Sequence, residues 1–426
     1  MKKIISLAKQ RGFIFPSSEI YGGFNSSYDF GPLGSLLKRN IKESWLKEMF
    51  NNQENIVNLD AAILMSPKVW EASGHLSKGF ADELVECKKC HKRYRLDQIK
   101  DKCEDCGGEL TEPKQFNLMM KTFVGSTEDE ASTAYLRAET CQGIYINFKN
   151  VLNSMRMKLP FGIAQIGKSF RNEITTKNFI FRMREFEQME MQWFCDPKEA
   201  DKWFDYWKEQ RLNWYLDLGV DPKKLRMQEI PDKERAHYAK RQIDLEYEFP
   251  FGWQEIEGIH NRGDWDLSQH TKHSGEKLDY EGKIPYIIET SVGVERSLLA
   301  FFIDAFNEIE GGRGEDSKKE QEIVLKLHKD LAPVKIAVLP LMKKEPLAGK
   351  AQEVYQLLKK QYITQYDQQG SIGKRYRRQD EIGTLYCVTI DFDTVEKGTV
   401  TVRDRDTMDQ ETIEIDKLME YFSKKI

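Results

Sequence analysis

The sequence predicts an α+β protein, in which an antiparallel sheet flanked by helices is followed by a smaller α/β domain. Three observations predict this fold. Strand-like runs dominate residues 161–305, strands and helices alternate over residues 331–426, and four cysteines mark a compact insertion at about 84–112. Because 426 residues are too many for one ordinary core, we expect one domain over 1–330 and a second over 331–426.

The composition is typical of a soluble globular protein, and we expect a cytoplasmic one. Hydrophobic residues make up 40% of the chain, charged residues make up 31%, and no apolar run approaches the roughly 20 residues that span a bilayer. The opening MKKIISLAKQRGF does not develop the apolar stretch of a secretory signal, because Lys9, Gln10 and Arg11 interrupt it. The net charge of -4 gives no overall signal for nucleic acid, so any RNA contact must come from local basic patches.

The first predicted element is a glycine-rich loop that leads into a long helix. The stretch YGGFNSSYDFGPLG precedes LLKRNIKESWLKEMF, and the apolar side chains of the second stretch recur at helical spacing. These side chains are Leu36, Leu37, Ile41, Trp45 and Met49.

Four cysteines follow with the spacing of a metal site, C-x2-C-x12-C-x2-C. They are Cys87, Cys90, Cys103 and Cys106. Their thiolates can converge tetrahedrally on one Zn²⁺, and Gly107 and Gly108 permit the tight turn of a metal knuckle. Sulfur would fill all four positions and leave none for water, so the spacing predicts a structural zinc site. Four reduced cysteines in a surface insertion are the alternative.

The segment FRMREFEQMEMQWF at 181–194 predicts a strand with one polar face, because alternate residues of a strand share a face. That face comprises Arg182, Arg184, Phe186, Gln188, Glu190 and Gln192. The preceding run LPFGIAQIGKSFRNE predicts a second strand that would bring Arg171 near Arg184. Two adjacent arginines repel unless an anion lies between them, and their guanidinium groups suit phosphate. The alternative is a solvated sheet face.

A further strand and helix are predicted in IPYIIETSVGVERSLLAFFIDAF at 284–306. Glu289 and Ser291 would share a strand face, and Gly293 would precede a helix with Arg296 in its first turn. A helix N-terminus beside an arginine favours anions, although simple packing is the commoner meaning of such a junction. Between the two strand regions, ADKWFDYWKEQRLNWYLDLG predicts a helical insertion at about 198–240.

Together these segments resemble the three signature motifs of class II aminoacyl-tRNA synthetases, and the particular residues in them are similar to those of homodimeric glycyl-tRNA synthetases. The resemblance covers almost the whole chain. It rests on YDFGPLG, FRNEI with FRMREFEQME, and ETSVGVER for the three motifs, and on LRAETCQGIYINF, GWQEIEGI and SIGKRYRRQDEIGTLYCVTIDFDT elsewhere. It implies a ligase that activates glycine with ATP as glycyl-adenylate and transfers the glycine to the 3′ end of tRNA(Gly).

The resemblance assigns one set of residues to ATP. Arg171 would hold the α-phosphate, and Phe186 would stack on the adenine. Arg184 and Arg296 would grip the tail phosphates, and Glu255 would support Mg²⁺. Arg171 and Arg296 are the expected catalytic residues. The full expected set is Arg171, Asn172, Glu173, Phe181, Arg182, Met183, Arg184, Glu185, Phe186, Glu255, Ile256, Gly293, Val294, Glu295 and Arg296.

A second set would bind glycine. Glu190, Glu289 and Ser291 would surround its ammonium group, with Glu139 and Arg95 on the same side. The full expected set is Arg95, Glu139, Phe186, Glu187, Gln188, Met189, Glu190, Glu289, Thr290, Ser291, Val292 and Gly293. The glycine carboxylate is already ionised, so the reaction needs positioning and charge stabilisation rather than a general base.

The resemblance also implies macromolecular partners. The C-terminal domain would bind the anticodon through a basic cluster beside Tyr376, for which a solvated loop is the alternative. The expected tRNA contacts are Lys374, Arg375, Arg377 and Arg378. Residues 29–50 would form the interface of a homodimer.

The chain departs from the family pattern at four pocket positions, where proline or alanine is favoured. These are Ala138, Cys141, Thr290 and Val292. None of these departures removes a charged ligand, so we expect only small changes in pocket shape.

Three other functions are open on the sequence. A synthetase for proline, threonine or histidine would share the motifs, but the acidic set Glu190, Glu289 and Ser291 favours glycine. A non-catalytic, nucleic-acid-binding relative would commonly lose the arginines at 171, 184 and 296, which are present. A metal-dependent regulator would leave most of the chain unexplained.

Overall fold

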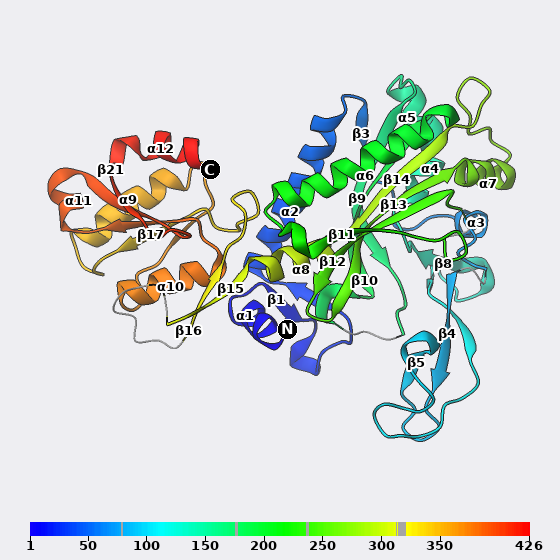
Figure 1. Cartoon of the computed structure of the whole chain (residues 1–426), viewed down its shortest axis with the longest axis horizontal. Helices are drawn as coiled ribbons and strands as arrows, with labels where there is room; N and C mark the ends of the chain where they lie inside the picture. The colour runs from blue at the N-terminus through cyan, green and yellow to red at the C-terminus, as the bar shows by residue number, and fades with distance from the viewer. Residues whose placement is uncertain (78–79, 175–177, 236–237, 312, 314–320) are drawn as a thin grey trace.

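The computed structural model describes residues 1–77, 80–174, 178–235, 238–311, 313 and 321–426. Within these residues the larger part is built on a seven-stranded sheet, in the order β11-β12-β13-β14-β10-β9-β3 (Figure 1). Neighbouring strands are antiparallel except β3 and β9, which run parallel. The strands are β3 (Ile56–Asn58), β9 (Phe161–Phe170), β10 (Glu185–Cys195), β11 (Leu225–Glu229), β12 (Arg241–Phe249), β13 (Gly252–Gly263) and β14 (Tyr286–Gly293). The expected antiparallel sheet is confirmed.

Three helices cover one face of this sheet: α2 (Pro32–Asn52), α6 (Ala200–Asp217) and α8 (Val294–Ala305). The odd-numbered residues of β10 point towards them, and Met189, Met191 and Trp193 are fully buried there. The predicted long helix is α2, which begins with a proline in its first turn, where the missing N–H costs nothing. Its apolar face, including Trp45, is buried in the same core.

The helical insertion expected at about 198–240 is shorter than predicted. Its helix ends with α6 at Asp217, and Leu225–Glu229 forms β11, the edge strand that pairs with β12. Arg226 and Gln228 lie towards solvent on β11 while Leu225 is buried. The helical pattern therefore applies only to the first half of this segment.

Shorter elements close the other parts of the first region. The N-terminal segment forms α1 (Lys2–Gln10) and the hairpin of β1 (Ile14–Pro16) and β2 (Tyr28–Phe30). The far end of the sheet is covered by α3 (Pro67–Ala72), the hairpin of β7 (Met120–Phe123) and β8 (Thr133–Leu136), α4 (Cys141–Ile146), α5 (Phe148–Ser154) and α7 (Trp265–Ser274). Among the described residues, no helix combines the length and apolar character needed to cross a membrane.

The cysteine insertion projects from this body as an arm (Figure 1). A three-stranded sheet in the order β5-β4-β6 carries it, from β4 (Ala81–Glu86) through β5 (Arg93–Arg95) to β6 (Lys114–Asn117). The arm begins at Ala81 and ends at Asn117, and these two residues are paired in the sheet. Both strands therefore join the body at the same place.

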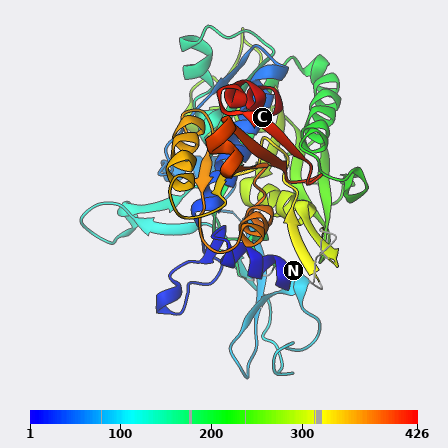
Figure 2. The same ribbon diagram turned by 90° about the vertical axis from the view of Figure 1, so that its left-hand side faces the viewer.

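The C-terminal region is an α/β domain, as predicted, with a sheet in the order β18-β17-β19-β20-β21. Its strands are β17 (Ile336–Pro340), β18 (Thr364–Tyr366), β19 (Tyr386–Ile390), β20 (Thr399–Asp404) and β21 (Gln410–Glu414). Its helices are α9 (Leu347–Leu358), α10 (Ile372–Ile382), α11 (Phe392–Lys397) and α12 (Leu418–Lys425). α9 and α12 pack on one face of the sheet and α10 packs on the other. In Figure 2 this domain lies in front of the body.

Ion pairs attach α10 to the first region. Arg11, which follows α1, pairs with Glu381 of α10. Arg313 pairs with Asp380, which also binds Arg403 of β20 at 3.0 Å. α10 also packs against the hairpin of β15 (Phe306–Glu310) and β16 (Gln321–Leu325). The boundary expected between residues 330 and 331 stays a prediction, and β17 begins shortly after it.

Candidate active site

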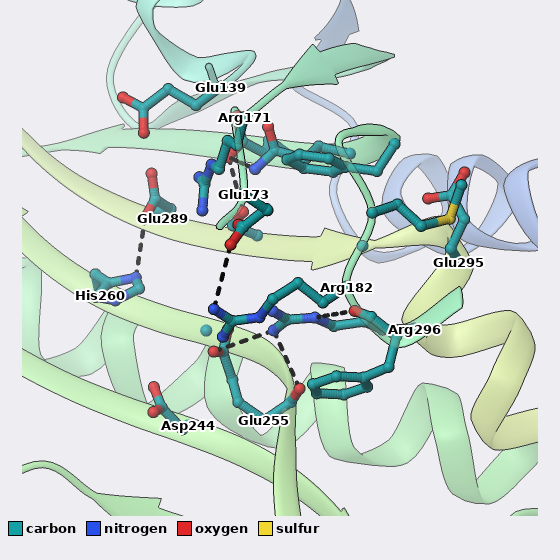
Figure 3. A pocket seen from close by; sticks show the side chains of 18 of the residues that line it. Glu139, Arg171, Glu173, Arg182, Asp244, Glu255, His260, Glu289, Glu295 and Arg296 are labelled. Carbon is teal, nitrogen blue, oxygen red and sulfur yellow. Dashed lines mark hydrogen bonds and ion pairs between the residues drawn. The ribbon is translucent and has the colours of Figure 1, made fainter. Parts of the chain in front are cut away.

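A cavity of about 260 Å³ opens on the face of the large sheet that α2, α6 and α8 leave free. Strands β10, β12, β13 and β14 bring side chains to it, and Arg171 enters from the segment that follows β9. Many of the predicted residues line it: Glu139, Arg171, Glu173, Phe181, Arg182, Met183, Phe186, Gln188, Glu190, Glu255, Glu289, Ser291, Gly293, Glu295 and Arg296. In Figure 3, Glu139 and Glu289 lie at one end, Arg182 and Arg296 lie at the other, and Arg171 lies between them.

Arg171 is held between two aromatic rings at the centre of the cavity wall. Its guanidinium carbon lies 5.5 Å from the ring centre of Phe80 and 5.4 Å from that of Phe186. Its Nε donates to the carbonyl oxygen of Ala138 at 3.1 Å. The two rings fix the plane of the guanidinium group, which lines the cavity and can donate to an anion bound there.

The second cationic group is Arg296, in the first turn of α8. Its guanidinium carbon lies 4.6 Å from the centre of the Phe181 ring. Its Nη1 lies 3.2 Å from a carboxylate oxygen of Glu255. Arg182 lies nearby and binds Glu173 at 3.3 Å. This end of the cavity therefore presents a cluster of cations whose positions are set by neighbouring carboxylates and rings.

The opposite end is acidic and rich in hydrogen bonds. Glu190 of β10 accepts hydrogen bonds from the hydroxyl groups of Thr140 and Ser291, the latter at 2.7 Å. Glu289 of β14 accepts from Arg262 at 3.1 Å and lies 2.9 Å from the Nδ1 of His260. Both carboxylates are almost fully buried.

The surroundings give these two carboxylates different proton affinities. Burial, and then the negative charges of Glu289 and Glu139, raise the pKa of Glu190 to about 7. Burial would also raise the pKa of Glu289, but Arg262 and His260 outweigh it and lower that pKa to about 2. Glu289 is thus the permanent anion, and Glu190 is the one whose charge changes near neutral pH.

The cavity includes residues that the sequence reasoning missed, most of them from β12, β13 or the segment before β12, and one, Ile180, from the turn before β10. They are Ile180, Tyr238, Gln242, Asp244, Gly258, His260 and Arg262. The alternating polar residues of GIHNRG were the available signal. A β-bulge obscured it, because Ile256 has no partner in β12 and shifts the alternation by one residue. Glu255 and Gly258 consequently share the cavity, while Glu257 faces α6 and binds Arg211 at 2.6 Å.

Several residues expected at the ATP end lie outside the cavity. β10 begins only at Glu185, so the alternation of the strand does not extend back to Arg184. The Arg184 guanidinium instead binds the carbonyl oxygens of Glu173 and Asn25, at 3.3 and 3.4 Å. Glu185 is exposed and pairs with Lys168. The remaining exceptions are Asn172, which is outside the lining, and Ile256 and Val294, which are buried in the core.

The expected glycine set contains similar exceptions. Glu187 points to the helical face and pairs with Lys38 at 3.0 Å. Arg95 lies on the arm and pairs with Asp82 at 3.0 Å. Met189, Thr290 and Val292 are buried on the side of the sheet away from the cavity. In each strand the error is the same: neighbours of a cavity residue were included although successive side chains point to opposite faces.

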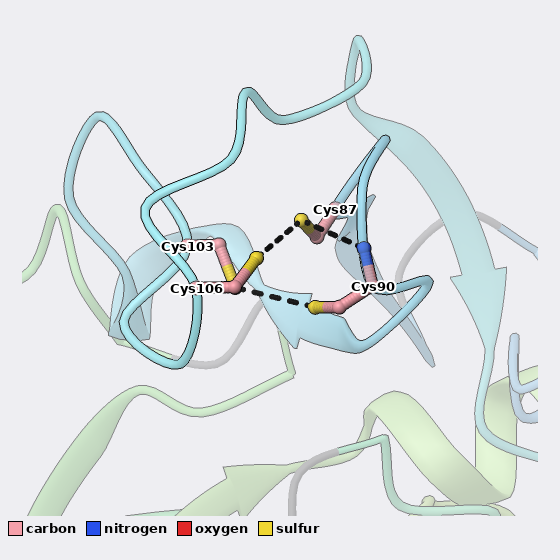
Figure 4. A group of neighbouring side chains, drawn as sticks. All are labelled: Cys87, Cys90, Cys103 and Cys106. Atoms are coloured by element: carbon pink, nitrogen blue, oxygen red, sulfur yellow. Dashed lines mark hydrogen bonds between the residues drawn. The ribbon is translucent and has the colours of Figure 1, made fainter.

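The four cysteines of the arm lie together (Figure 4). Their sulfur atoms are within 4.8 Å of one another, with 3.5 Å between Cys87 and Cys106 and 3.6 Å between Cys90 and Cys103. Tetrahedral Zn–S bonds of about 2.3 Å place sulfur atoms about 3.8 Å apart, so the cluster could hold zinc. A Cβ atom on Gly108 would lie 2.8 Å from the Cys87 sulfur, which explains a glycine at this position.

The basic cluster of the C-terminal domain is only partly available. Its residues lie on α10, and helical geometry turns Arg375 inward, where it is 2% exposed and binds backbone carbonyl oxygens, including that of Asp367 at 3.3 Å. Arg375 is thus not available at the surface, and the predicted RNA contacts of the cluster stay a prediction. Lys374 is exposed, and Arg377 and Arg378 are partly exposed.

The fold and the cavity define a class II aminoacyl-tRNA synthetase. A model of the tRNA synthetase class II core domain (G, H, P, S and T) matches residues 123–304, and a model of the anticodon binding domain matches residues 335–425. The chain belongs to the glycine--tRNA ligase family within this class. Over 424 residues it is 55% identical to the Glycine--tRNA ligase of Treponema denticola. The aligned region covers 96% of this chain and 93% of that protein.

Other relatives extend over the whole chain. The Glycine--tRNA ligase of Borreliella burgdorferi is 52% identical and that of Thermobifida fusca is 48% identical, each covering 100% of this chain and 97% or 98% of the relative. A solved prolyl-tRNA synthetase from Cryptosporidium parvum has the same fold, with a TM-score of 0.67 and 16% identity, covering 99% of this chain and 74% of that one. The expected family is confirmed, and the sequence resemblance to glycine--tRNA ligases separates the chain from the proline, threonine and histidine enzymes.

Proposed function

We propose that this cavity carries out both steps of glycine--tRNA ligation. The observation that carries the proposal is the division of one cavity into a cationic end, with Arg171, Arg182 and Arg296, and an acidic end, with Glu190 and Glu289. The cationic end suits the phosphates of ATP, and the acidic end suits the ammonium group of glycine. Two reactants bound in this way meet near Arg171.

ATP lies with its phosphates along the arginines. Arg171 holds the α-phosphate, and its stacking against Phe80 and Phe186 keeps the guanidinium fork fixed. Arg296 and Arg182 bind the remaining phosphates, in the place first expected for Arg184. Phe186, which lines the cavity beside Arg171, offers its free ring surface to the adenine.

Two carboxylates of the cavity, Glu255 beside Arg296 and Asp244 near Glu255, fit a magnesium ion. Asp244 and Glu255 both line the cavity, and burial and then the charge of Glu255 raise the pKa of Asp244 to about 6. A divalent cation relieves such repulsion, and carboxylate oxygens are the ligands that Mg²⁺ prefers. Bound there with ATP, the ion would neutralise phosphate charge.

Glycine lies at the acidic end with its ammonium group between Glu190 and Glu289. Its carboxylate oxygen attacks the α-phosphorus, the bond from that phosphorus to the β-phosphate oxygen breaks, and pyrophosphate leaves. Arg171 stabilises the charge that develops on the α-phosphate. A ribose hydroxyl at the 3′ end of the tRNA then attacks the carbonyl carbon of glycyl-adenylate and releases AMP.

Selection of glycine is steric in this arrangement. An added methylene would be worth only about 1–3 kcal/mol in an open apolar pocket. Here the carboxylates are locked by neighbours, since Glu190 is bound by Thr140, Ser291 and Gln188. A β-carbon would have to displace a group that is already hydrogen-bonded.

The reaction is expected to depend on pH through Glu190. Its pKa is raised to about 7 mainly by burial, so the carboxylate is protonated below that pH and charged above it. Because the charged form binds ammonium, kcat/KM for glycine should rise with pH and be about tenfold lower at pH 6 than at pH 8. Glu190→Gln should be weakly active with a flat profile over this range. A flat wild-type profile would contradict this role.

The C-terminal domain binds tRNA in this proposal through Lys374, Arg377 and Arg378. Arg377→Ala should reduce tRNA charging at limiting tRNA about three- to tenfold and leave glycine-dependent ATP–pyrophosphate exchange unchanged, because one phosphate contact is lost. Arg375→Ala serves as the contrast: it removes a buried structural group and should lower the melting temperature. Equal loss of charging and exchange in Arg377→Ala would count against the RNA contact.

Three further parts of the proposal concern the whole molecule. The cysteine cluster holds a structural Zn²⁺. A homodimer forms through residues 29–50, where α2 leaves Arg39, Glu43 and Lys47 exposed on one side. The cytoplasmic location stays a prediction.

ATP–pyrophosphate exchange with each of the twenty amino acids tests the activity without needing the tRNA. Exchange with glycine alone is the expected result. Exchange with a different amino acid would point to another synthetase specificity. Silence with all twenty, in folded and zinc-replete protein, would overturn the proposal in favour of a non-catalytic, nucleic-acid-binding role.

A further inference from the structure

A buried aromatic cluster of Trp70, His75 and Phe80 lies directly behind Glu139. His75 follows α3 and is 7% exposed. Its ring packs edge-on against Trp70, with 5.3 Å between ring centres, and against Phe80 at 4.5 Å. Asn117, at the end of β6, donates to the backbone oxygen of His75 at 2.8 Å. The segment carrying His75 is therefore fixed on several sides.

Both nitrogens of the His75 ring face oxygen atoms. Nδ1 lies 2.7 Å from the Ser73 hydroxyl, and Nε2 lies 3.4 Å from a carboxylate oxygen of Glu139. The Ser73 hydroxyl also lies 3.4 Å from the carbonyl oxygen of Trp70. With an N–H on Nε2, the ring donates to Glu139 while Nδ1 is bound to Ser73.

Glu139 is held in one orientation by this histidine and by α4. Its other carboxylate oxygen accepts from Cys141 at 3.0 Å and from Gln142 at 2.8 Å. Burial would raise the pKa of Glu139, but His75 and then Arg262 outweigh it and hold that pKa well below the usual range. The carboxylate nevertheless lines the cavity.

The same cluster supports Arg171 on its other side. Phe80 stacks on the guanidinium group of Arg171, and Ala138, the residue before Glu139, accepts the hydrogen bond from its Nε. His75 and Phe80 are in direct contact. One packed unit thus carries a carboxylate of the acidic end and the arginine at the centre of the cavity.

We propose that His75 is a positioning residue for glycine activation, which holds the carboxylate of Glu139 oriented towards the ammonium group of glycine. This inference rests on the proposed function, which places glycine beside Glu139. His75 does not touch the substrate. It acts through Glu139, in the way that outer hydrogen bonds orient the ligands of a metal or the groups of a catalytic site.

The test is His75→Gln, which keeps a polar side chain of similar length but removes the imidazole ring and its Nε2 contact with Glu139. The KM for glycine in ATP–pyrophosphate exchange should rise about tenfold or more, with the KM for ATP and kcat changed less than about threefold. His273→Gln, at the exposed end of α7, is the matched control and should change none of these values. Unchanged glycine KM, or loss of kcat with both KM values intact, would overturn the proposal.

A milder substitution and a spectroscopic measurement test the same proposal without relying on His75→Gln. If His75→Gln does not fold, Ser73→Ala removes only the hydroxyl group bound to Nδ1 and should raise the glycine KM about threefold, while an unchanged KM would overturn the proposal. In ¹⁵N spectra of the histidine rings, Glu139→Gln should shift the Nε2 signal of His75, and no shift would refute the contact. The spectrum needs no activity, so it separates failure of this inference from failure of the proposed function.

Discussion

Replacing Arg171 by alanine is expected to lower glycine-dependent ATP–pyrophosphate exchange about 10³-fold, which corresponds to about 4 kcal/mol of lost transition-state stabilisation. The size of this expected loss follows from the position of Arg171 in the cavity. Arg171 lies between the two ends of the cavity, and two aromatic rings hold its guanidinium group before any substrate binds. Its contribution therefore needs little reorganisation when charge develops on the α-phosphate.

Two variants make this expectation specific. Arg171→Lys keeps the charge but loses the planar fork and the stacking, so it should recover only a small part of the activity. Arg226→Ala, which removes an exposed arginine from the edge strand β11, should retain full exchange. If Arg171→Ala lost less than about tenfold while remaining folded, the assignment of the α-phosphate to this residue would be wrong.

Replacing Cys103 by serine is expected to release the metal and unfold the arm. Structural zinc supplies about 10–16 kcal/mol in isolated zinc-finger peptides, and the buried apolar cluster of the arm is small. Metal analysis should find one zinc per wild-type chain and none in the variant. Amide exchange should accelerate across β4, β5 and β6 and stay slow in β9 and β10.

Cys195→Ala is the control for this experiment, because Cys195 is a free, buried cysteine in the large sheet, away from the cluster. It should keep one zinc per chain. A Cys103→Ser protein that retained both zinc and a protected arm would contradict the structural role. So would a wild-type protein with an ordered arm and no metal.

The sequence predicted the regular parts of the site well, for a physical reason. Inside a strand the period of two is strict, so Gln188, Glu190, Glu289 and Ser291 could be placed on one face. The predictions failed where the regular alternation of a strand ends or is interrupted. The alternation does not extend past the start of β10 to Arg184, and the bulge at Ile256 hides the relation between Glu255 and Gly258.

The cluster on α10 illustrates a different limit. A run of basic residues in sequence suggests a single basic surface, but a helix turns 100° per residue and distributes four of them around its circumference. Arg375 consequently faces the domain interior while Lys374 faces solvent. The roles of Glu139 and the C-terminal domain came from family resemblance, because neither a loop carboxylate nor a basic helix indicates its partner by pattern alone.

The ion pairs that attach α10 to the first region have a consequence for tRNA selection. The helix that carries Lys374 and Arg377 also carries Asp380 and Glu381, which bind Arg313 and Arg11. The domain that reads the anticodon in the proposed function is thus fastened to the body by the reading helix itself. In the proposed function, these ion pairs would hold the anticodon-binding domain at a set distance from the cavity. We therefore expect a tRNA shortened by a few base pairs to be charged poorly, because its two ends would not reach both sites at once.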